Sequence, residues 1–244
     1  MQTNLILKAF LTLLFFLSQV NLRAQTELLI WSDIGKYNSS QGLFIKSSVI
    51  AQHRFGKNLI RTGSQLNIIN RNTKIFSGFI GTYSRNFKIK NTKLQIQGFC
   101  LWTMPSEILY EFNWGILLKM KQNHFNMTLG TNFRTYAFNR KTIRNYGIDS
   151  RASKLHENFN LMYSFDYLIK PSDCTWNIGI SLTNFDYFTI NQETNPVFNL
   201  KGYYNLNSTV KLFAETWYKS SGVTNLEVNY FGLLFRTGVI WDIN

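Results

Sequence analysis

Few residues of this chain have the type and spacing that catalysis requires. The three histidines are His53, His124 and His156, and a serine hydrolase needs a histidine within hydrogen-bond reach of a serine, usually with a third group that orients it. Only His156 has such neighbours in the sequence, because Glu157 follows it and Ser153 precedes it. That cluster could hydrolyse an ester, but no motif of a known hydrolase family surrounds it. We therefore expect no catalytic residue.

Metal and cofactor chemistry has even less support. The chain has two cysteines, no spacing typical of a metal site and no glycine-rich loop that could cradle phosphate. Cys100 and Cys174 lie in different segments, and nothing in their surroundings favours a disulfide. We expect neither a metal ion nor a cofactor.

Positive charge is the chemically distinctive property, since 26 Lys and Arg residues stand against 13 Asp and Glu residues. One cluster lies between Asn139 and Leu155, where Asp149 is the sole acid. Its basic residues are Arg140, Lys141, Arg144, Arg151 and Lys154. Such a patch could bind acidic polysaccharide or lipid phosphate, or it could simply be solvated.

Most other charged residues lie in segments in which apolar and polar residues alternate with period two, so the face that each one occupies can be predicted. In 108–120, for example, Phe112, Trp114 and Ile116 share one face, and Asn113 and Gly115 lie on the other. Twelve segments of this kind fall at 26–35, 42–55, 58–70, 74–88, 93–102, 108–120, 125–134, 159–169, 175–188, 196–205, 209–218 and 225–243.

Long strands with one apolar and one wet face predict an all-β fold, a transmembrane antiparallel up-and-down β-barrel of about 12 strands, with 10 or 14 as alternatives. Short expected turns at 56–57, 90–92, 122–124, 171–173 and 205–207 alternate with mostly longer connections at 36–41, 104–107, 139–155 and 190–195. This alternation fits short periplasmic turns and longer outer loops. A soluble β-sandwich also alternates, but its strands average about five or six residues.

The N-terminal residues 1–24 are expected to be a cleaved signal peptide. Lys8 precedes the apolar run from Ala9 to Leu17, and Ala24 ends the segment before Gln25. The run is shorter than a membrane-spanning helix, although an uncleaved anchor stays the alternative. Residues 25–244 then form a single barrel domain.

The C-terminal strand carries a spaced set of residues typical of outer-membrane barrels, formed by Arg236, Gly238, Trp241 and Ile243. Together with the Ala24–Gln25 boundary, this motif resembles the ends of small outer-membrane β-barrel proteins of the Bacteroidetes type. The resemblance implies location in the bacterial outer membrane, contact with its lipid, and insertion by the barrel-insertion machinery. It implies no activity.

Charged residues on the predicted inner face would line the lumen. They are Lys46, Arg54, Arg61, Glu111, Lys119, Arg134, Asp166, Lys201, Lys211, Glu215 and Arg236. The basic excess favours a passive, narrow channel for small anionic solutes. Alternatively, Glu111, Asp166 and Glu215 pair with Arg134, Lys211 or Arg61, and a closed, non-conducting barrel binds another envelope protein. An outer-membrane lipid hydrolase that uses His156 is the least favoured function, and the compartment excludes nucleic acid.

Aromatic residues near strand ends are expected to anchor the barrel at the membrane interfaces. The set comprises Trp102, Tyr136, Tyr187 and Trp217 at the outer ends and Tyr83, Trp176, Tyr204 and Trp241 at the inner ends.

Overall fold

A computed structural model describes residues 25–37, 43–69, 75–90, 92–104, 109–149, 154–169, 171, 175–219 and 231–243. The predicted signal peptide, residues 1–24, lies outside the described residues. Among the helices that are described, none has the length and hydropathy needed to cross a bilayer.

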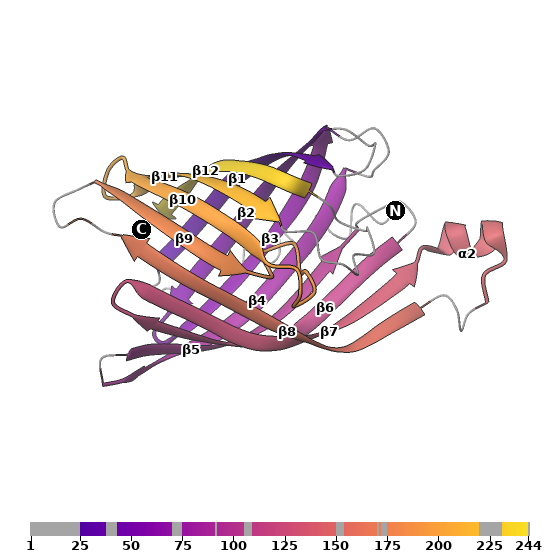
Figure 1. Cartoon of the computed structure of the whole chain (residues 1–244), viewed down its shortest axis with the longest axis horizontal. Helices are drawn as coiled ribbons and strands as arrows, with labels where there is room; N and C mark the ends of the chain where they lie inside the picture. Colours follow the sequence, from indigo (N-terminus) through magenta and orange to yellow (C-terminus); the bar gives the residue numbers. More distant parts are fainter. Residues whose placement is uncertain are drawn as a thin grey trace.

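Within the described residues, the fold comprises twelve strands and one short helix (Figure 1). The elements are β1 (Gln25–Tyr37), β2 (Leu43–Phe55), β3 (Asn58–Ile69), β4 (Phe76–Ile89), β5 (Thr92–Thr103), β6 (Leu109–Gln122), β7 (Phe125–Phe138), α2 (Arg140–Tyr146), β8 (Lys154–Ile169), β9 (Trp176–Thr183), β10 (Val197–Asn205), β11 (Val210–Lys219) and β12 (Phe231–Ile243).

Each strand pairs antiparallel with its neighbours in sequence, and β12 returns to pair with β1, so the sheet is a closed barrel. The closing pair is long, because it runs from Thr26 opposite Ile243 to Tyr37 opposite Phe231. Closure leaves no sheet edge around the ring, which is what a barrel in lipid requires. The predicted fold class and strand number are confirmed.

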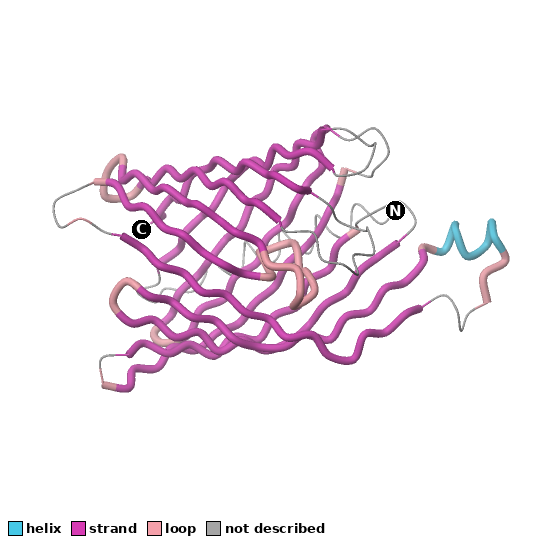
Figure 2. The backbone as a smooth tube through the Cα atoms, viewed as in Figure 1, coloured by secondary structure: helices cyan, strands magenta, loops and turns pink. Residues whose placement is uncertain are grey.

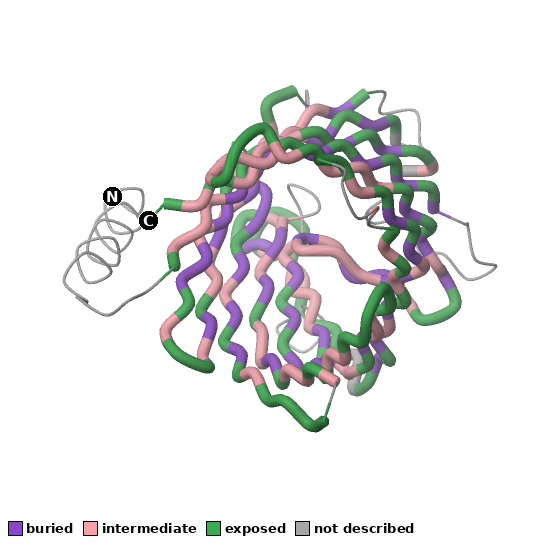
Figure 3. Tube along the Cα trace, turned by 90° about the vertical axis from the view of Figure 1, so that its left-hand side faces the viewer, coloured by how far each residue is buried: buried purple, intermediate pink, exposed green. Residues whose placement is uncertain are grey.

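Alternate residues of each strand face the lumen and the outside, as the alternating purple and green residues of Figure 3 show. In β6, Asn113 is fully buried and Leu117 is nearly so, whereas Trp114 and Ile116 between them are exposed. The cross-strand register carries this alternation around the ring, so that Asn113 lies between Leu101 and Arg134 on the inner face. The barrel therefore presents large apolar side chains outward and most of its polar groups inward.

Strand β9 is shorter than the sequence predicted, and this is a correction. The segment 175–188 was expected to be one strand, but β9 ends at Thr183. The side chain of Asn184 then bonds to the edge of β8, accepting from the Tyr163 amide at 2.9 Å and donating to the Leu161 carbonyl at 2.7 Å. Because these bonds replace the next backbone pairs, the chain leaves the wall.

The connection from Asn184 to Pro196, called the inner loop below, turns into the barrel. Figure 2 shows it within the outline of the barrel instead of beyond the rim. Its Phe188 and Ile190 are buried against inward-facing apolar residues of the wall. That interior cluster comprises Leu29, Trp31, Ile50, Ile80, Leu101, Leu117, Met162, Phe188, Ile190 and Phe213. Side chains and a folded segment thus fill part of the lumen.

A hairpin arm, residues 135–149 and 154–156, joins β7 to β8 at the end of the barrel where the inner loop joins β9 to β10. It projects beyond the neighbouring strands (Figure 1). Helix α2 lies at its tip and buries no residue. The side chain of Asn139 caps its first turn, and Gly147 ends it at φ 61° in the left-handed region. The sequence prediction of a plain loop missed this helix, although Asn and Gly at these positions are its usual boundary signals.

Candidate functional site

The inner loop is held in the lumen by charged and aromatic side chains of the wall. The carboxylate of Asp186 accepts from Arg236 Nη2 at 2.6 Å and from Nη1 at 3.2 Å. Across the lumen, Arg134 Nη2 donates to the Ile190 carbonyl at 2.6 Å. The ring of Tyr187 lies 5.4 Å from the ring of Trp31. Strands β1, β7 and β12 therefore fix one conformation of the loop.

Arg236 is the centre of the largest charge network. Besides Asp186, it contacts Asp33 through Nε at 2.6 Å and Glu215 through Nη1 at 3.6 Å. Its guanidinium also lies between two indole rings, 4.9 Å from Trp31 and 5.2 Å from Trp217. Through three carboxylates and two aromatic rings, this buried arginine joins β1, β11, β12 and the inner loop.

Two further ion pairs join different strands, one between the neighbours β6 and β7 and one between β8 and β10 across β9. Arg134 Nε lies 3.1 Å from Glu111, and Lys201 Nζ lies 2.6 Å from Asp166. Of the pairings considered from the sequence, that between Glu111 and Arg134 is present. Asp166 and Glu215 instead pair with Lys201 and Arg236.

Five of the cations predicted to line the lumen contact no carboxylate in the described part of the chain. They are Lys46, Arg54, Arg61, Lys119 and Lys211. Arg61 donates to the side-chain oxygen of Gln52, with Nε at 3.0 Å, and its guanidinium lies 5.2 Å from the ring centroid of Tyr187. These five side chains thus keep positive charge in the lumen.

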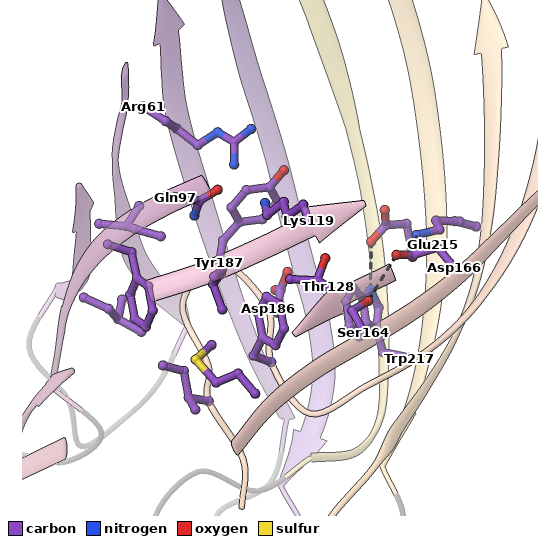
Figure 4. A pocket seen from close by; sticks show the side chains of 18 of the residues that line it. Arg61, Gln97, Lys119, Thr128, Ser164, Asp166, Asp186, Tyr187, Glu215 and Trp217 are labelled. Carbon is purple, nitrogen blue, oxygen red and sulfur yellow. Dashed lines mark hydrogen bonds and ion pairs between the residues drawn. The ribbon is translucent and has the colours of Figure 1, made fainter. Parts of the chain in front are cut away.

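A cavity of about 260 Å³ lies beside the inner loop inside the barrel. In Figure 4, Arg61, Gln97, Lys119 and Tyr187 gather on one side of it, and Asp166 and Glu215 lie on the other. Its volume is close to the lower end of ligand pockets, which range over about 300–1,000 Å³. A cavity of this size suits a small solute.

The structure places all the predicted lumen charges on the inner face, by their register with buried inward residues. The acids that sequence reasoning missed are Asp33, which bonds Arg236 from β1, and Asp186 of the inner loop. Asp33 could have been found, because it shares the parity of Trp31 in an alternating segment. Asp186 has no such signal, since its position depends on the turn at Asn184.

Part of the predicted aromatic belt is wrong. Trp217 and Tyr136 point inward: Trp217 Nε1 donates to Glu215 at 2.8 Å, and the Tyr136 hydroxyl accepts from Arg134 at 3.1 Å. Tyr187 lies on the inner loop against Trp31. Their register parity, which aromatic type alone does not reveal, puts Trp217 and Tyr136 beside the lumen charges. The others, Trp102, Tyr83, Trp176, Tyr204 and Trp241, have the outward parity.

The remaining candidates lie on the hairpin arm and near the end of β12. Arg140, Lys141 and Arg144 are on α2, Lys154 begins β8, and Arg151 is outside the described residues. Gly238 faces inward, where an added Cβ would lie 2.3 Å from the Ile30 carbonyl oxygen, and Trp241 and Ile243 are exposed on the outer face.

The histidine cluster is not assembled as a hydrolase site in the described part of the chain. His156 Nδ1 lies 3.0 Å from the Thr135 hydroxyl, on the hairpin arm. Ser153 and the side chain of Glu157 lie outside the described residues. Where side chains are described, no group of three or more His, Cys, Asp or Glu residues could hold a metal ion.

A closed antiparallel barrel with an apolar outside, a charged inside and strands of 8 to 16 residues is a transmembrane β-barrel of the outer-membrane type. No family model matches the sequence, and no curated protein matches it. Solved structures do match the fold. A KdgM porin in complex with disordered oligogalacturonate is 11% identical, with a TM-score of 0.51 over 91% of this chain and 99% of that one.

The NanC porin is 10% identical, with a TM-score of 0.51 over 88% of this chain and the whole of that one. At such identities the likeness shows the fold alone. The shared fold and the barrel's outward apolar surface agree in describing a transmembrane β-barrel.

Proposed function

We propose that this barrel is a passive, narrow outer-membrane channel that prefers small anionic solutes. The observation that carries the proposal is the charge left on the inner face after ion pairing. Asp33, Glu111, Asp166, Asp186 and Glu215 all contact Arg or Lys side chains.

Five of the predicted inner-face cations keep no such partner. Among the described acids of the wall, Glu27 and Asp242 lie opposite each other with inward parity and also stand outside these pairs, and Glu27 accepts from Gln52 at 2.7 Å. A lumen with excess positive charge lowers the energy of an anion inside it and raises that of a cation. The inner loop narrows the path, which supports small solutes as cargo.

Planar-bilayer recordings of the purified protein test the proposal. Under a KCl gradient, the reversal potential is expected to show that Cl⁻ permeates more readily than K⁺. Lys211→Glu reverses one inner-face charge and should reduce that preference, whereas Lys57→Glu, in the exposed turn between β2 and β3, should not. Absence of conductance steps, or preference for K⁺, would show that the proposal is wrong.

We propose in addition that the chain is of the Bacteroidetes type, with residues 1–24 removed on export and the C-terminal motif read by the insertion machinery. The support is the sequence of the two ends. Mass spectrometry of protein purified from outer membranes should find Gln25 at the N-terminus. A mature chain that retains Lys8 would contradict cleavage.

The hairpin arm supports a second interaction, with phosphate groups of outer-leaflet lipid. Arg140, Lys141 and Arg144 lie on a helix that buries no residue, so their charges are available to a partner. Neutralising all three to Gln should lower binding to vesicles that contain anionic phospholipid and leave binding to neutral vesicles unchanged. Equal binding of both proteins to the anionic vesicles would count against this interaction.

A further inference from the structure

We infer that the lumen cavity contains a built site for one compact oxyanion, a carboxylate or phosphate group, formed by Arg61, Lys119, Gln97 and Thr128. The inference rests on the proposed channel function and deepens it. A solute would bind at one specific place during passage, in addition to the general electrostatic attraction of a positively charged lumen.

The charged half of the site comes from two strands that are not neighbours. Arg61 is on β3 and Lys119 is on β6, and both line the cavity. They lie close enough for their charges to repel each other. Neither contacts a carboxylate, although Arg134, Lys201 and Arg236 nearby all do. Two like charges held together inside a barrel are stabilised by an anion between them.

The neutral half consists of two polar side chains with unused hydrogen-bonding groups. Gln97 is 5% exposed and Thr128 is 6% exposed, and both line the same cavity. Neither side chain has a hydrogen-bond partner in the part of the chain that the structure describes. Their amide and hydroxyl groups line the cavity beside two cations that contact no carboxylate, so they are available to hydrogen-bond a ligand there.

The register brings these groups to one patch of wall. Lys119 lies directly opposite Thr128 on β7, and Gln97 on β5 lies opposite Leu117, two residues before Lys119. Figure 4 shows Gln97 and Lys119 near Tyr187, with Arg61 above them. The Tyr187 ring lies under the Arg61 guanidinium and Gln52 holds its Nε, so the arginine is oriented before a ligand arrives.

The chemistry of the four groups selects an oxyanion. Guanidinium and ammonium groups donate to carboxylate and phosphate oxygens, and the Gln97 amide and Thr128 hydroxyl can donate as well. The carboxylates of the opposite side, Asp166 and Glu215, are engaged by Lys201 and Arg236. Asp166 still attracts Lys119 electrostatically, but neither carboxylate forms an ion pair with Lys119 or Arg61.

Calorimetry on the purified full-length protein in detergent tests the site without requiring conduction. Inorganic phosphate and acetate are the probes, and glycerol is the uncharged control. We expect saturable binding of an oxyanion with one site per chain and no binding of glycerol. Comparing the two oxyanions distinguishes a phosphate site from a carboxylate site.

Three variants locate the binding. Lys119→Gln should weaken oxyanion affinity at least tenfold, and Gln97→Glu, which is nearly isosteric, should abolish binding because its carboxylate occupies the cations. Lys57→Gln makes the same charge change as Lys119→Gln in an exposed turn and should stay within twofold of the unaltered protein. Resistance of each variant to unfolding in SDS confirms that it is folded.

The outcomes separate the site from the channel. Anion preference in bilayers without saturable binding overturns the site and leaves the proposed function standing. Saturable binding that Gln97→Glu leaves intact places the anion elsewhere and also overturns it. Saturable binding lost in both lumen variants supports the site even if the reversal potential shows no anion preference.

Discussion

Asp186 and Arg236, 50 residues apart in the chain, are joined by two hydrogen bonds of 2.6 and 3.2 Å that tie the inner loop to β12. The same guanidinium bonds Asp33 of β1. Because β1 and β12 close the barrel, one side chain links ring closure to the position of the segment that narrows the lumen. Loop position and channel width should therefore depend on this contact.

Replacing Asp186 should widen the channel. Asp186→Ala removes the bond from the loop and leaves Arg236 paired with Asp33, so the barrel stays closed while the loop loses its strongest restraint. A charge-assisted hydrogen bond contributes about 1.5–3 kcal/mol. We expect larger or noisier single-channel conductance steps in bilayers. Asp149→Ala on the hairpin arm is the control, and identical steps in all three proteins would show that the bond does not restrain the loop.

Replacing Arg236 should instead destabilise the whole barrel. Arg236→Met keeps much of the side-chain volume between Trp31 and Trp217 but leaves Asp33, Asp186 and Glu215 without their cation. Removing one partner of a buried ion pair costs about 3–5 kcal/mol. Urea unfolding in lipid vesicles should show a loss of that size.

Lys211→Met is the matched control, because Lys211 is also on the inner face and has no ion pair there. Its free energy of unfolding should stay within about 0.5 kcal/mol of the original. A loss as large as that of Arg236→Met would mean that any lumen charge, and not this network, sets the stability.

The lipid-facing wall gives a third prediction. Ile116 is 59% exposed at the middle of β6, between the inward Gly115 and Leu117. A Lys at the bilayer midplane on this face costs about 2–4 kcal/mol. Ile116→Lys should lower unfolding stability in vesicles by that amount, and Ile116→Leu should have little effect. Equal stability of the two variants would contradict an outward Ile116.

The barrel could be predicted from the sequence because period two maps directly onto two faces. In β6 and β7, inward and outward positions alternate from Glu111 to Lys119 and from Phe125 to Arg134, and residue polarity largely follows that alternation, with the inward Leu117 as an exception. Because lipid contacts one face of the wall and water the other, outward residues are mostly apolar and inward residues are mostly polar. Strand number and approximate bounds follow from it.

The inner loop could not be predicted in this way, because 184–188 continues a strand-like mixture of polar and apolar residues. What ends β9 is a side-chain amide, that of Asn184, which takes over backbone bonds of β8. The choice between a longer strand and an inward turn depends on contacts with Arg236 and Trp31, which are both distant from the loop in the sequence.

The same limit applies to the site. Parity assigned Arg61 and Lys119 to the inner face, but which acids neutralise which cations depends on distances across the lumen. Glu215 pairs with Arg236 and not with Arg61 because Arg236 lies directly opposite it in the register of β11 and β12. The unpartnered Gln97 and Thr128 become evident only when the cavity is seen.

Cysteine labelling gives the last prediction and tests the orientation of the wall directly. Cys100 is exposed and has the outward parity of Trp102 on β5, whereas Lys119 on β6 lines the cavity. In a Cys174→Ser background, a hydrophobic maleimide delivered through lipid should modify Cys100, and a small anionic thiosulfonate should not. In the background Cys100→Ser and Cys174→Ser, Lys119→Cys should show the opposite preference, because the aqueous lumen is its only approach. Modification of Cys100 by the anionic reagent at the rate of Lys119→Cys would mean that the outer face of β5 is not covered by lipid.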